Sequence, residues 1–600
     1  MGYVLMGRMV NGNPYLIWVA SEAKAENVPA MLGWRAAYKG DPSAPETFSL
    51  AGKSVYFLII DRFARKDAGK DYPACTGVTP RFCGGNIQGI TQRLDYIQGM
   101  GFDCIWITPP VKQFASDGCH KVGGKEWCHD GFSGYWAEDF FQLDAHFGTP
   151  EDLKELSTRL HERKMCLVLD MVTNHAGIID SEAATKRIHP FNKMEYYNEL
   201  AGPGSLWRVQ GLNATWHPPP RDVSQCGPRN HDNIFCVSWC GPGAYVCPEY
   251  DQTYVDSGWF GTLGDLNQSH PFVKEQLLKY ATQMVLNYSI DAIRLDTAAF
   301  MPRDFLADLQ TAVGVQIIGE VTTMNMTHQA SYQRFPPRIS SFTPSKPILA
   351  GTLNFPLFYY STGAFCGWIT FLGRVGQPNM TNLSTVIRHQ HNCDLYEDTA
   401  VLGNFLDNHD EQARIAYACQ NDKSRLKNAL TWVMLHKGIP MIYYGTEQGF
   451  ASRKAHDHWQ GDSAIRESLW QTDYNTKTWQ YTFIRRLNHI RRFYHIGGDV
   501  DIHSAEDDPN KMVFTRGSNH GHVGVAWVFV NNFPEADVDK NVTYCPGPLP
   551  PTVRGNEWVE VLSQDGAAVL AYGCYHAKDR NPKVLVLQKT TRSSFDVAFV

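Results

Sequence analysis

Short apolar segments alternate with amphipathic helical segments over residues 55–495 of this chain. Apolar runs bounded by turn residues are typical of buried strands. An alternation of this length favours a (β/α)8 barrel, in which each parallel strand is followed by a helix on the outside. The runs that we predict as barrel strands are 55–61, 104–109, 165–172, 290–296, 315–320, 405–410 and 439–445.

Two of the intervening helices carry clear signals. Thr149 is predicted to cap a helix that begins at Pro150, and Asp152 can complete a capping box. A second helix is predicted over residues 273–288, where apolar side chains recur at helical spacing. Both helices fit the outer layer of the barrel.

Changes in composition divide the chain into five parts. Residues 1–45 are predicted to be an irregular N-terminal extension, and 46–175 the first part of the barrel. Residues 176–262 are rich in Pro, Gly, Asn and Cys, so we predict a small inserted domain B after the third strand. The barrel resumes over 263–495. Residues 496–600 are predicted to form an antiparallel β-sandwich, which a Cys545–Cys574 disulfide could link.

Three carboxylates each end one of the predicted barrel strands: Asp296, Glu320 and Asp410. The C-terminal ends of the strands are where such barrels carry their active sites. Glycoside hydrolysis requires a pair of acids in this kind of position. The alternative is a set of structural ion pairs. Arg294 near Asp296 and His409 next to Asp410 favour a catalytic role instead.

The neighbours of these acids predict different roles. Arg294 and Asp296 share one face of a strand, so the guanidinium should lower the pKa of Asp296 by about 1–3 units, as suits a nucleophile. Glu320 has no basic neighbour in the sequence and should hold its proton, as a general acid requires. Asp410 follows His409 and is predicted to stabilise the charge of the transition state.

The composition is that of a soluble globular protein, with 43% hydrophobic and 19% charged residues. A net charge of -6 gives no support to nucleic-acid or anionic-membrane binding. No run reaches the roughly 18 apolar residues of a membrane span. The 16 Trp and 27 Tyr suit a carbohydrate binder, although core packing is the alternative reading for each of them. With no signal for oligomerisation, we expect a monomer.

The chain has 15 cysteines, several of them in short-range clusters that indicate disulfides and an oxidising compartment. A zinc site is the weaker alternative, because no CxxC pair occurs. Cys104 and Cys166 lie inside apolar runs and are predicted to be buried and reduced.

We expect a secreted glycoprotein, although the N-terminus is not a good signal peptide. Candidate glycosylation sites are Asn213, Asn287, Asn325, Asn379, Asn382 and Asn541.

Four segments, in this order, resemble the signature segments of the α-amylase family of glycoside hydrolases. They are Asp170–His175, Asp291–Asp296, Gly319–Val321 and Phe405–Asp410. The chain is most similar to secreted fungal α-amylases of the Taka-amylase type, from about Val55 to about Tyr494. The resemblance implies a TIM barrel with an inserted domain and a C-terminal β domain.

The resemblance also implies a role for each matching residue. Asp296 would be the nucleophile, Glu320 the general acid/base and Asp410 the transition-state stabiliser, with Arg294 orienting Asp296. The substrate-binding residues would be His175, His409, Tyr135, Trp136, Asp462 and Arg466. A structural Ca2+ would be held by Asn174, Asp256, Asp265 and a main-chain carbonyl near Phe300. For Asp256 and Asp265, turn capping is the alternative.

Three positions depart from the family pattern. Ser133 replaces a His before Gly134-Tyr135-Trp136, and Ala299 and Phe300 replace a Lys-His pair. Each lost hydrogen bond to sugar would cost about 0.5–1.5 kcal/mol. The expected activity is endo-hydrolysis of α-1,4 bonds in starch- or glycogen-like glucans. The alternatives are a 4-α-glucanotransferase or a transglycosylating maltogenic enzyme and, in another class, an inactive glucan-binding or cell-wall assembly protein.

Overall fold

The computed structural model describes most of the barrel and of the C-terminal region. The described residues are 3–10, 13–20, 48–66, 79–115, 120–122, 125–127, 129–179, 182–198, 256, 263–333, 347–369, 374–392, 395–454, 464–504, 507–517, 526–537, 541–546, 556–562, 570–571 and 574–589.

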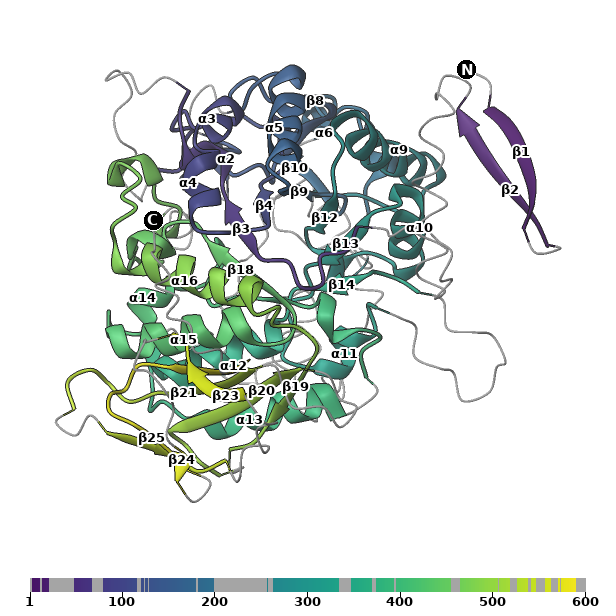
Figure 1. Cartoon of the computed structure of the whole chain (residues 1–600). Helices are drawn as coiled ribbons and strands as arrows, with labels where there is room; N and C mark the ends of the chain where they lie inside the picture. Colours follow the sequence, from purple (N-terminus) through teal and green to yellow (C-terminus); the bar gives the residue numbers. More distant parts are fainter. Residues whose placement is uncertain are drawn as a thin grey trace, which may run out of the picture.

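Eight parallel strands form a barrel at the centre of the molecule (Figure 1). Neighbours in the chain are neighbours in the sheet, and a parallel bridge between Leu353 and Gly403 joins the two end strands. The strands are β3 (Val55–Leu58), β4 (Cys104–Ile107), β9 (Cys166–Met171), β12 (Ala292–Leu295), β13 (Gln316–Gly319), β14 (Gly351–Thr352), β17 (Gly403–Asn404) and β18 (Ile439–Tyr443). The predicted barrel is therefore confirmed, and six of its strands are shorter than predicted. The prediction of a strand over 405–410 was wrong, because β17 ends at Asn404, and β14 was not predicted.

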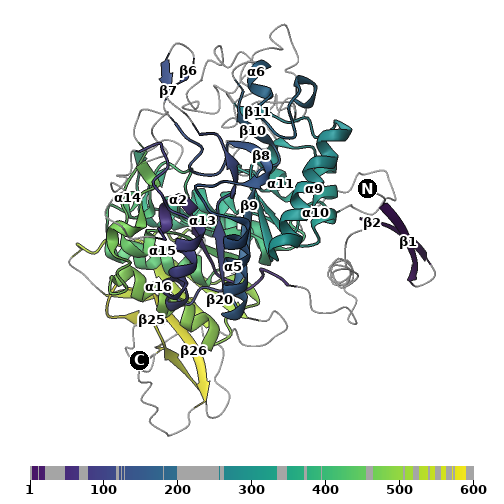
Figure 2. The same cartoon turned by 90° about the horizontal axis from the view of Figure 1, so that it is seen from above.

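Helices cover the outside of the barrel (Figures 1 and 2). Helix α5 (Pro150–Glu162) begins with the predicted capping box of Thr149 and Asp152, and α9 (Pro271–Tyr288) is the second predicted helix. The other helices are α2 (Ile60–Phe63), α3 (Ile87–Gln92), α4 (Leu94–Gly99), α6 (Glu182–Thr185), α10 (Arg303–Val313), α11 (Met326–Ala330), α12 (Phe355–Cys366), α13 (Met380–Asn392), α14 (Ile415–Ala418), α15 (Lys423–Leu435) and α16 (Trp479–Phe493).

The chain leaves and re-enters the barrel on paired strands after β9. Strand β10 (His175–Ile178) is antiparallel to β11 (Leu263–Asp265), and His175 is opposite Asp265. This pairing confirms an insertion after the third barrel strand, most of which lies outside the described residues. Smaller antiparallel pairs, β5 (Val111–Gln113) with β8 (Ala137–Leu143) and β6 (His120–Val122) with β7 (Lys125–Trp127), lie between β4 and α5.

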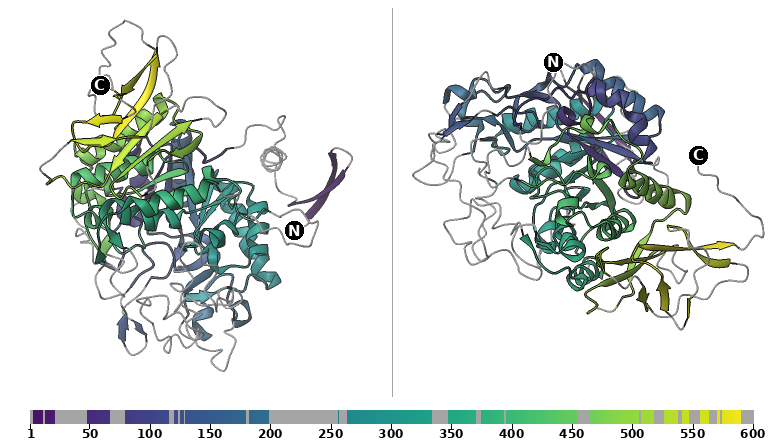
Figure 3. Two further views of the ribbon diagram at one scale, coloured as in Figure 1. Left: turned by 90° about the horizontal axis from the view of Figure 1, so that it is seen from below. Right: turned by 90° about the vertical axis from the view of Figure 1, so that its left-hand side faces the viewer.

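The C-terminal region forms two antiparallel sheets, seen at one end of the molecule in Figure 3. Aromatic and aliphatic side chains from both sheets, among them Phe529, Tyr544 and Tyr575, pack into one core. This packing confirms the predicted β-domain, and Cys545 and Cys574 form the predicted disulfide. The strands are β19 (Asp499–Ile502), β20 (Lys511–Gly517), β21 (Ala526–Asn531), β22 (Val542–Tyr544), β23 (Asn556–Glu560), β24 (Leu570–Ala571), β25 (Cys574–Ala577) and β26 (Lys583–Lys589).

The prediction for two barrel cysteines was right about their burial and wrong about their reduced state. Cys104 and Cys166 form a disulfide, because they are register partners on the adjacent parallel strands β4 and β9. The sequence places them in separate apolar runs and does not show that they are neighbours. A further disulfide joins Cys366 to Cys419, and Cys83 is also disulfide-bonded. Several bonds of this kind support an oxidising compartment.

Two smaller expectations also differ from the structure. The N-terminal extension is not irregular throughout, because β1 (Tyr3–Val10) and β2 (Asn13–Ala20) form an antiparallel hairpin. The dipeptide Asn11-Gly12 between them is a strong hairpin signal.

Asn325 is a poor glycosylation site, because its side chain is buried and accepts a hydrogen bond from the His328 backbone. Among the described residues, no helix is long and apolar enough to cross a membrane.

Candidate active site

Two of the three predicted acids directly follow a barrel strand. Asp296 comes after β12 and Glu320 after β13, which are paired parallel strands, so both side chains start at the same end of the barrel. Asp410 does not follow a strand directly, because β17 ends at Asn404. The Asn408 side chain instead shapes the loop, accepting hydrogen bonds from the backbone N–H groups of Asp410 (2.8 Å) and Glu411 (3.0 Å).

Arg294 joins the acids into one cluster. Its side chain is 1% exposed, and its Nη1 donates to Asp296 Oδ1 (2.8 Å) and to both oxygens of Asp170 (2.9 and 3.0 Å). Its Nη2 lies 2.8 Å from Glu320 Oε2. Charge-assisted contacts of this kind are among the strongest hydrogen bonds in proteins. One buried guanidinium therefore sets the relative positions of three carboxylates.

Thr297 adds a second link between the two predicted catalytic acids. Its backbone N–H donates to Glu320 Oε2 (2.9 Å), and its hydroxyl donates to Asp296 Oδ2 (3.1 Å). The residue has a positive φ of 48°, which turns the chain immediately after the strand. This turn brings the Thr297 N–H to Glu320 while its side chain stays beside Asp296.

Burial decides the protonation of the two acids. It raises the pKa of Asp296 to about 6, although Arg294 acts in the opposite direction. The predicted lowering was wrong in sign, because it counted the charge of Arg294 without the loss of water around the carboxylate. Burial also raises the pKa of Glu320 to about 8, against the effect of Arg294. At neutral pH Asp296 is therefore ionised while Glu320 keeps its proton.

Asp410 is the most open of the three acids, with 41% of its side chain exposed. Desolvation acts to raise its pKa, but the hydrogen bond with His409 and the charges of Arg466 and Lys454 outweigh this effect and hold the pKa below its ordinary value. Burial lowers the pKa of His409 itself to about 4, so that ring is uncharged near neutral pH. The lasting positive charges beside Asp410 are therefore those of Arg466 and Lys454.

Asp170 is a buried acid to which we assigned no role from the sequence. Besides Arg294, it accepts hydrogen bonds from Trp106 Nε1 (3.0 Å) and from the Tyr135 hydroxyl (2.8 Å). Unlike Asp296, Asp170 does not end its apolar run, because Met171 and Val172 continue it, so the rule that identified the other acids passed it over. Its four hydrogen bonds make it the anchor of the Arg294 cluster.

Of the predicted sugar-binding aromatic residues, Tyr135 and His409 contact the acids directly, and the ring of Trp136 packs against Phe114 and His129. The ring of Tyr135 stacks on His409 at 5.1 Å, and His409 Nε2 lies 3.0 Å from Asp410 Oδ2. His175 is 1% exposed and its Nε2 lies 3.1 Å from the Tyr135 carbonyl. Trp136 is half-buried, with its backbone N–H donating to Gln113 Oε1 (2.6 Å). Asp462 lies outside the described residues.

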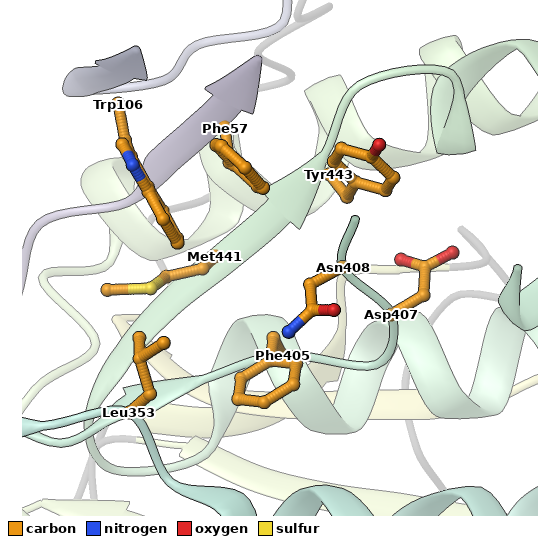
Figure 4. Close-up of a pocket in the computed structure, with 8 residues that line it drawn as sticks. All are labelled: Phe57, Trp106, Leu353, Phe405, Asp407, Asn408, Met441 and Tyr443. Atoms are coloured by element: carbon orange, nitrogen blue, oxygen red, sulfur yellow. The ribbon is translucent and has the colours of Figure 1, made fainter. Parts of the chain in front are cut away.

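Mostly apolar side chains surround a small cavity next to the strands β3 and β18 (Figure 4). Phe57 stacks on Trp106 at 3.7 Å and meets the His409 ring edge-on at 4.9 Å. The cavity left between Phe57, Trp106, Phe405 and Met441 has about 10 Å³, about the least space that holds one water molecule. Trp106 links this packing to the acid cluster, because its Nε1 donates to Asp170 Oδ2 (3.0 Å).

The three positions that depart from the family pattern are all buried. Ser133, Ala299 and Phe300 are each less than 7% exposed. The Ala299 carbonyl accepts a hydrogen bond from the Tyr332 hydroxyl (3.0 Å), which ties this segment to the barrel wall. Ala299 and Phe300 contribute apolar packing at a place where the family pattern has polar side chains.

Part of the predicted calcium set is brought together at the base of the insertion. The strand pairing puts Asp265 opposite His175, and the Leu266 backbone N–H donates to the Asn174 carbonyl (2.9 Å). Asn174 Oδ1 is buried without a hydrogen-bond partner in the described part of the chain. Asn198 Nδ2 donates both to Asp265 Oδ2 (2.6 Å) and to the Asp256 carbonyl (3.0 Å). A buried amide oxygen that lacks a partner, beside a carboxylate, fits a calcium ion.

Comparison with known proteins agrees with this geometry. The family described as "Alpha amylase, catalytic domain" matches residues 57–340 and 371–492. Alpha-amylase 2 of Schwanniomyces occidentalis is 31% identical over 463 residues, which are 76% of this chain and 74% of that protein. Alpha-amylase 1 of Lipomyces kononenkoae is also 31% identical, over 73% of this chain and 58% of that protein.

A solved structure is similar over nearly the whole chain. The alpha-amylase of Malbranchea cinnamomea superimposes with a TM-score of 0.68 at 28% identity, covering 90% of this chain and 96% of that one. The family match includes the strands that carry Asp170, Arg294, Asp296 and Glu320. The chain therefore belongs to the alpha-amylase family of glycoside hydrolases.

Proposed function

We propose that this protein is a retaining, endo-acting α-amylase that hydrolyses α-1,4 bonds of starch- or glycogen-like glucans. The observation that carries the proposal is the pair of acids on one guanidinium, with Asp296 ionised and Glu320 protonated at neutral pH. In retaining enzymes the two carboxyl groups are about 5–5.5 Å apart. A shared Arg294 supports a close spacing rather than the wider one that admits a water between the acids.

The proposed reaction has two steps. Asp296 attacks the anomeric carbon while Glu320 donates its proton to the leaving glycosidic oxygen, which gives a covalent glycosyl-enzyme. Glu320, now ionised, takes a proton from water, and that water displaces Asp296. Asp410 stabilises the positive charge that develops on the sugar in both transition states. Tyr135, Trp136, His175 and His409 are proposed to surround the sugar, and Asp462 to bind the next ones.

Timed product analysis on soluble starch and on maltoheptaose tests this function. We expect early products of intermediate length, because an endo-acting enzyme cuts inside the chain. Release of one short product from the first time point would indicate exo-hydrolysis. A complete lack of products from a folded, calcium-loaded protein would contradict the proposal and favour an inactive glucan-binding protein.

Glucan transfer is the second candidate, because the burial of Ala299 and Phe300 favours it. Apolar packing at these positions removes polar contacts to the sugar or water beside the cleavage point. The same covalent intermediate would then pass to another sugar instead of water. The maltoheptaose experiment separates the two activities, since only transfer makes chains longer than the substrate.

We also propose that a structural calcium ion binds between the barrel and the insertion. Asn174, Asp256 and Asp265 would hold it, with a main-chain carbonyl near Phe300 completing the set. Oxygen ligands of this kind suit calcium, which would supply charge to hold the insertion against the barrel. The disulfides support secretion into an oxidising, calcium-containing environment.

Removal of calcium should lower the melting temperature. A ligand at 100 times its Kd stabilises by about 2.7 kcal/mol, which for a chain of this size corresponds to a shift of about 2–3 °C. We expect EDTA to cause this shift and Ca2+, but not Mg2+, to reverse it in differential scanning calorimetry. Asn174→Ala should no longer respond to Ca2+. An Asn174→Ala protein that keeps the full calcium response would contradict the proposed site.

A further inference from the structure

Arg466 contacts the loop that carries Asp410. Its Nη2 donates to Asp410 Oδ1 (2.8 Å), and its Nε donates to the His409 carbonyl (3.0 Å). The residue is 7% exposed, whereas the Asp410 side chain is 41% exposed. One buried guanidinium therefore holds both the carboxylate of Asp410 and the backbone just before it.

A second layer of side chains holds Arg466 in turn. Arg62 Nε donates to the Arg466 carbonyl (3.0 Å), and the Arg62 guanidinium also donates to the carbonyls of Thr79 (2.7 Å) and Arg81 (3.1 Å). The ring of Phe132 lies 3.9 Å from the Arg62 guanidinium and 6.0 Å from that of Arg466. Arg62 and Phe132 are both buried, so these contacts restrict where Arg466 can lie.

The charge balance around Asp410 explains why such support matters. Asp410 is more open to water than Asp296 or Glu320, so the protein must hold its carboxylate in one orientation. The nearby His409 ring is uncharged near neutral pH and cannot supply a lasting positive charge. Lys454 donates to the backbone carbonyl of Asp410, not to its carboxylate. Among the described residues, Arg466 is the cation that is hydrogen-bonded to this carboxylate.

We propose that Arg466 is a positioning residue that keeps Asp410 ionised and aimed at the reacting sugar, and that Arg62 and Phe132 fix Arg466 for this task. This role rests on the proposed function of Asp410 and differs from the binding of more distant sugars, which the family resemblance implies for Arg466. A residue that acts through Asp410 affects the transition state of every substrate equally. A residue that binds distant sugars affects only substrates long enough to reach it.

A series of maltooligosaccharides of increasing length separates the two roles. For Arg466→Met we expect kcat to fall about 100-fold, as when one preorganised electrostatic group is lost from an active site. The loss should be the same for short and long substrates, with KM within about twofold of the wild-type value. Arg466→Lys keeps the charge and should recover part of kcat. A loss that appears in KM, and only with the longer substrates, would overturn the proposal.

Three further variants make the result unambiguous. Arg492→Met is the matched control, because Arg492 is 52% exposed and pairs with Asp103 away from the site; it should leave kcat unchanged. Phe132→Leu removes the aromatic ring that packs near Arg466 but leaves Arg466 itself in place. It should lower kcat several-fold with KM unchanged, and it tests the proposal if Arg466→Met fails to fold. Asp410→Asn tests the proposed function itself. If the wild type cleaves glucans and Asp410→Asn does not, but Arg466→Met retains full kcat, only the positioning role fails.

Discussion

Replacement of Asp296 by Asn is expected to abolish turnover while leaving glucan binding intact. The amide cannot attack the anomeric carbon, and loss of the nucleophile in other enzymes costs on the order of 10⁴–10⁶ in kcat. Asn has nearly the same shape as Asp, so its oxygen can still accept the hydrogen bond from Arg294 Nη1. Initial rates on maltoheptaose measure the loss of turnover, and calorimetric titration with the same sugar measures the remaining binding.

Asp291→Asn is the matched control for this experiment. Asp291 is five positions earlier in the chain and lies at the opposite end of β12, where it accepts hydrogen bonds from the Leu167 backbone and faces His161. We expect this variant to keep wild-type kcat. Activity that survives in Asp296→Asn would show that Asp296 is not the nucleophile.

The second large effect is expected from Glu320 and from pH. Activity of the wild type should fall below about pH 6, as Asp296 gains a proton, and above about pH 8, as Glu320 loses its proton. Loss of a general acid typically costs 10²–10⁴ in rate, so Glu320→Gln should be slow on maltoheptaose. For Glu320→Gln, kcat/KM measured over a pH series should no longer fall above about pH 8, which is the alkaline limb of the wild-type profile.

The leaving group identifies the acid more directly. A glycosyl fluoride such as α-maltosyl fluoride needs little help from a proton donor, so Glu320→Gln should use it almost as well as the wild type does in the first step. Glu411→Gln is the control, because burial raises the pKa of this neighbouring acid to about 8 as well. If Glu411→Gln, and not Glu320→Gln, removes the alkaline limb, the general acid is wrongly assigned.

Local patterns were sufficient for most of the elements and for the choice of candidate acids. The apolar runs predicted most of the barrel strands, and Thr149 with Asp152 marked a helix start that the structure confirms. Such features depend on residues close in the chain, which the sequence shows directly. The hairpin at the N-terminus was also readable from Asn11-Gly12, and its omission was an error of interpretation.

Contacts between distant segments could not be read in the same way. The Cys104–Cys166 disulfide depends on the register of β4 against β9, and the Arg294 cluster depends on β9, β12 and β13 lying side by side. The sign of the Asp296 pKa shift followed from burial by residues far away in the chain. Local charge alone gave the opposite answer.

By itself the sequence determined that this protein is an alternating α/β chain of the alpha-amylase family, with Asp296, Glu320 and Asp410 as its candidate acids. That information is local, because strands, helix caps and motif residues are set by near neighbours. Only the tertiary structure decided that Asp170 anchors Arg294, that Glu320 and Asp296 differ in protonation, and that Arg466 holds Asp410. Charge, burial and hydrogen bonding act through space, so they depend on which distant residues the fold brings together.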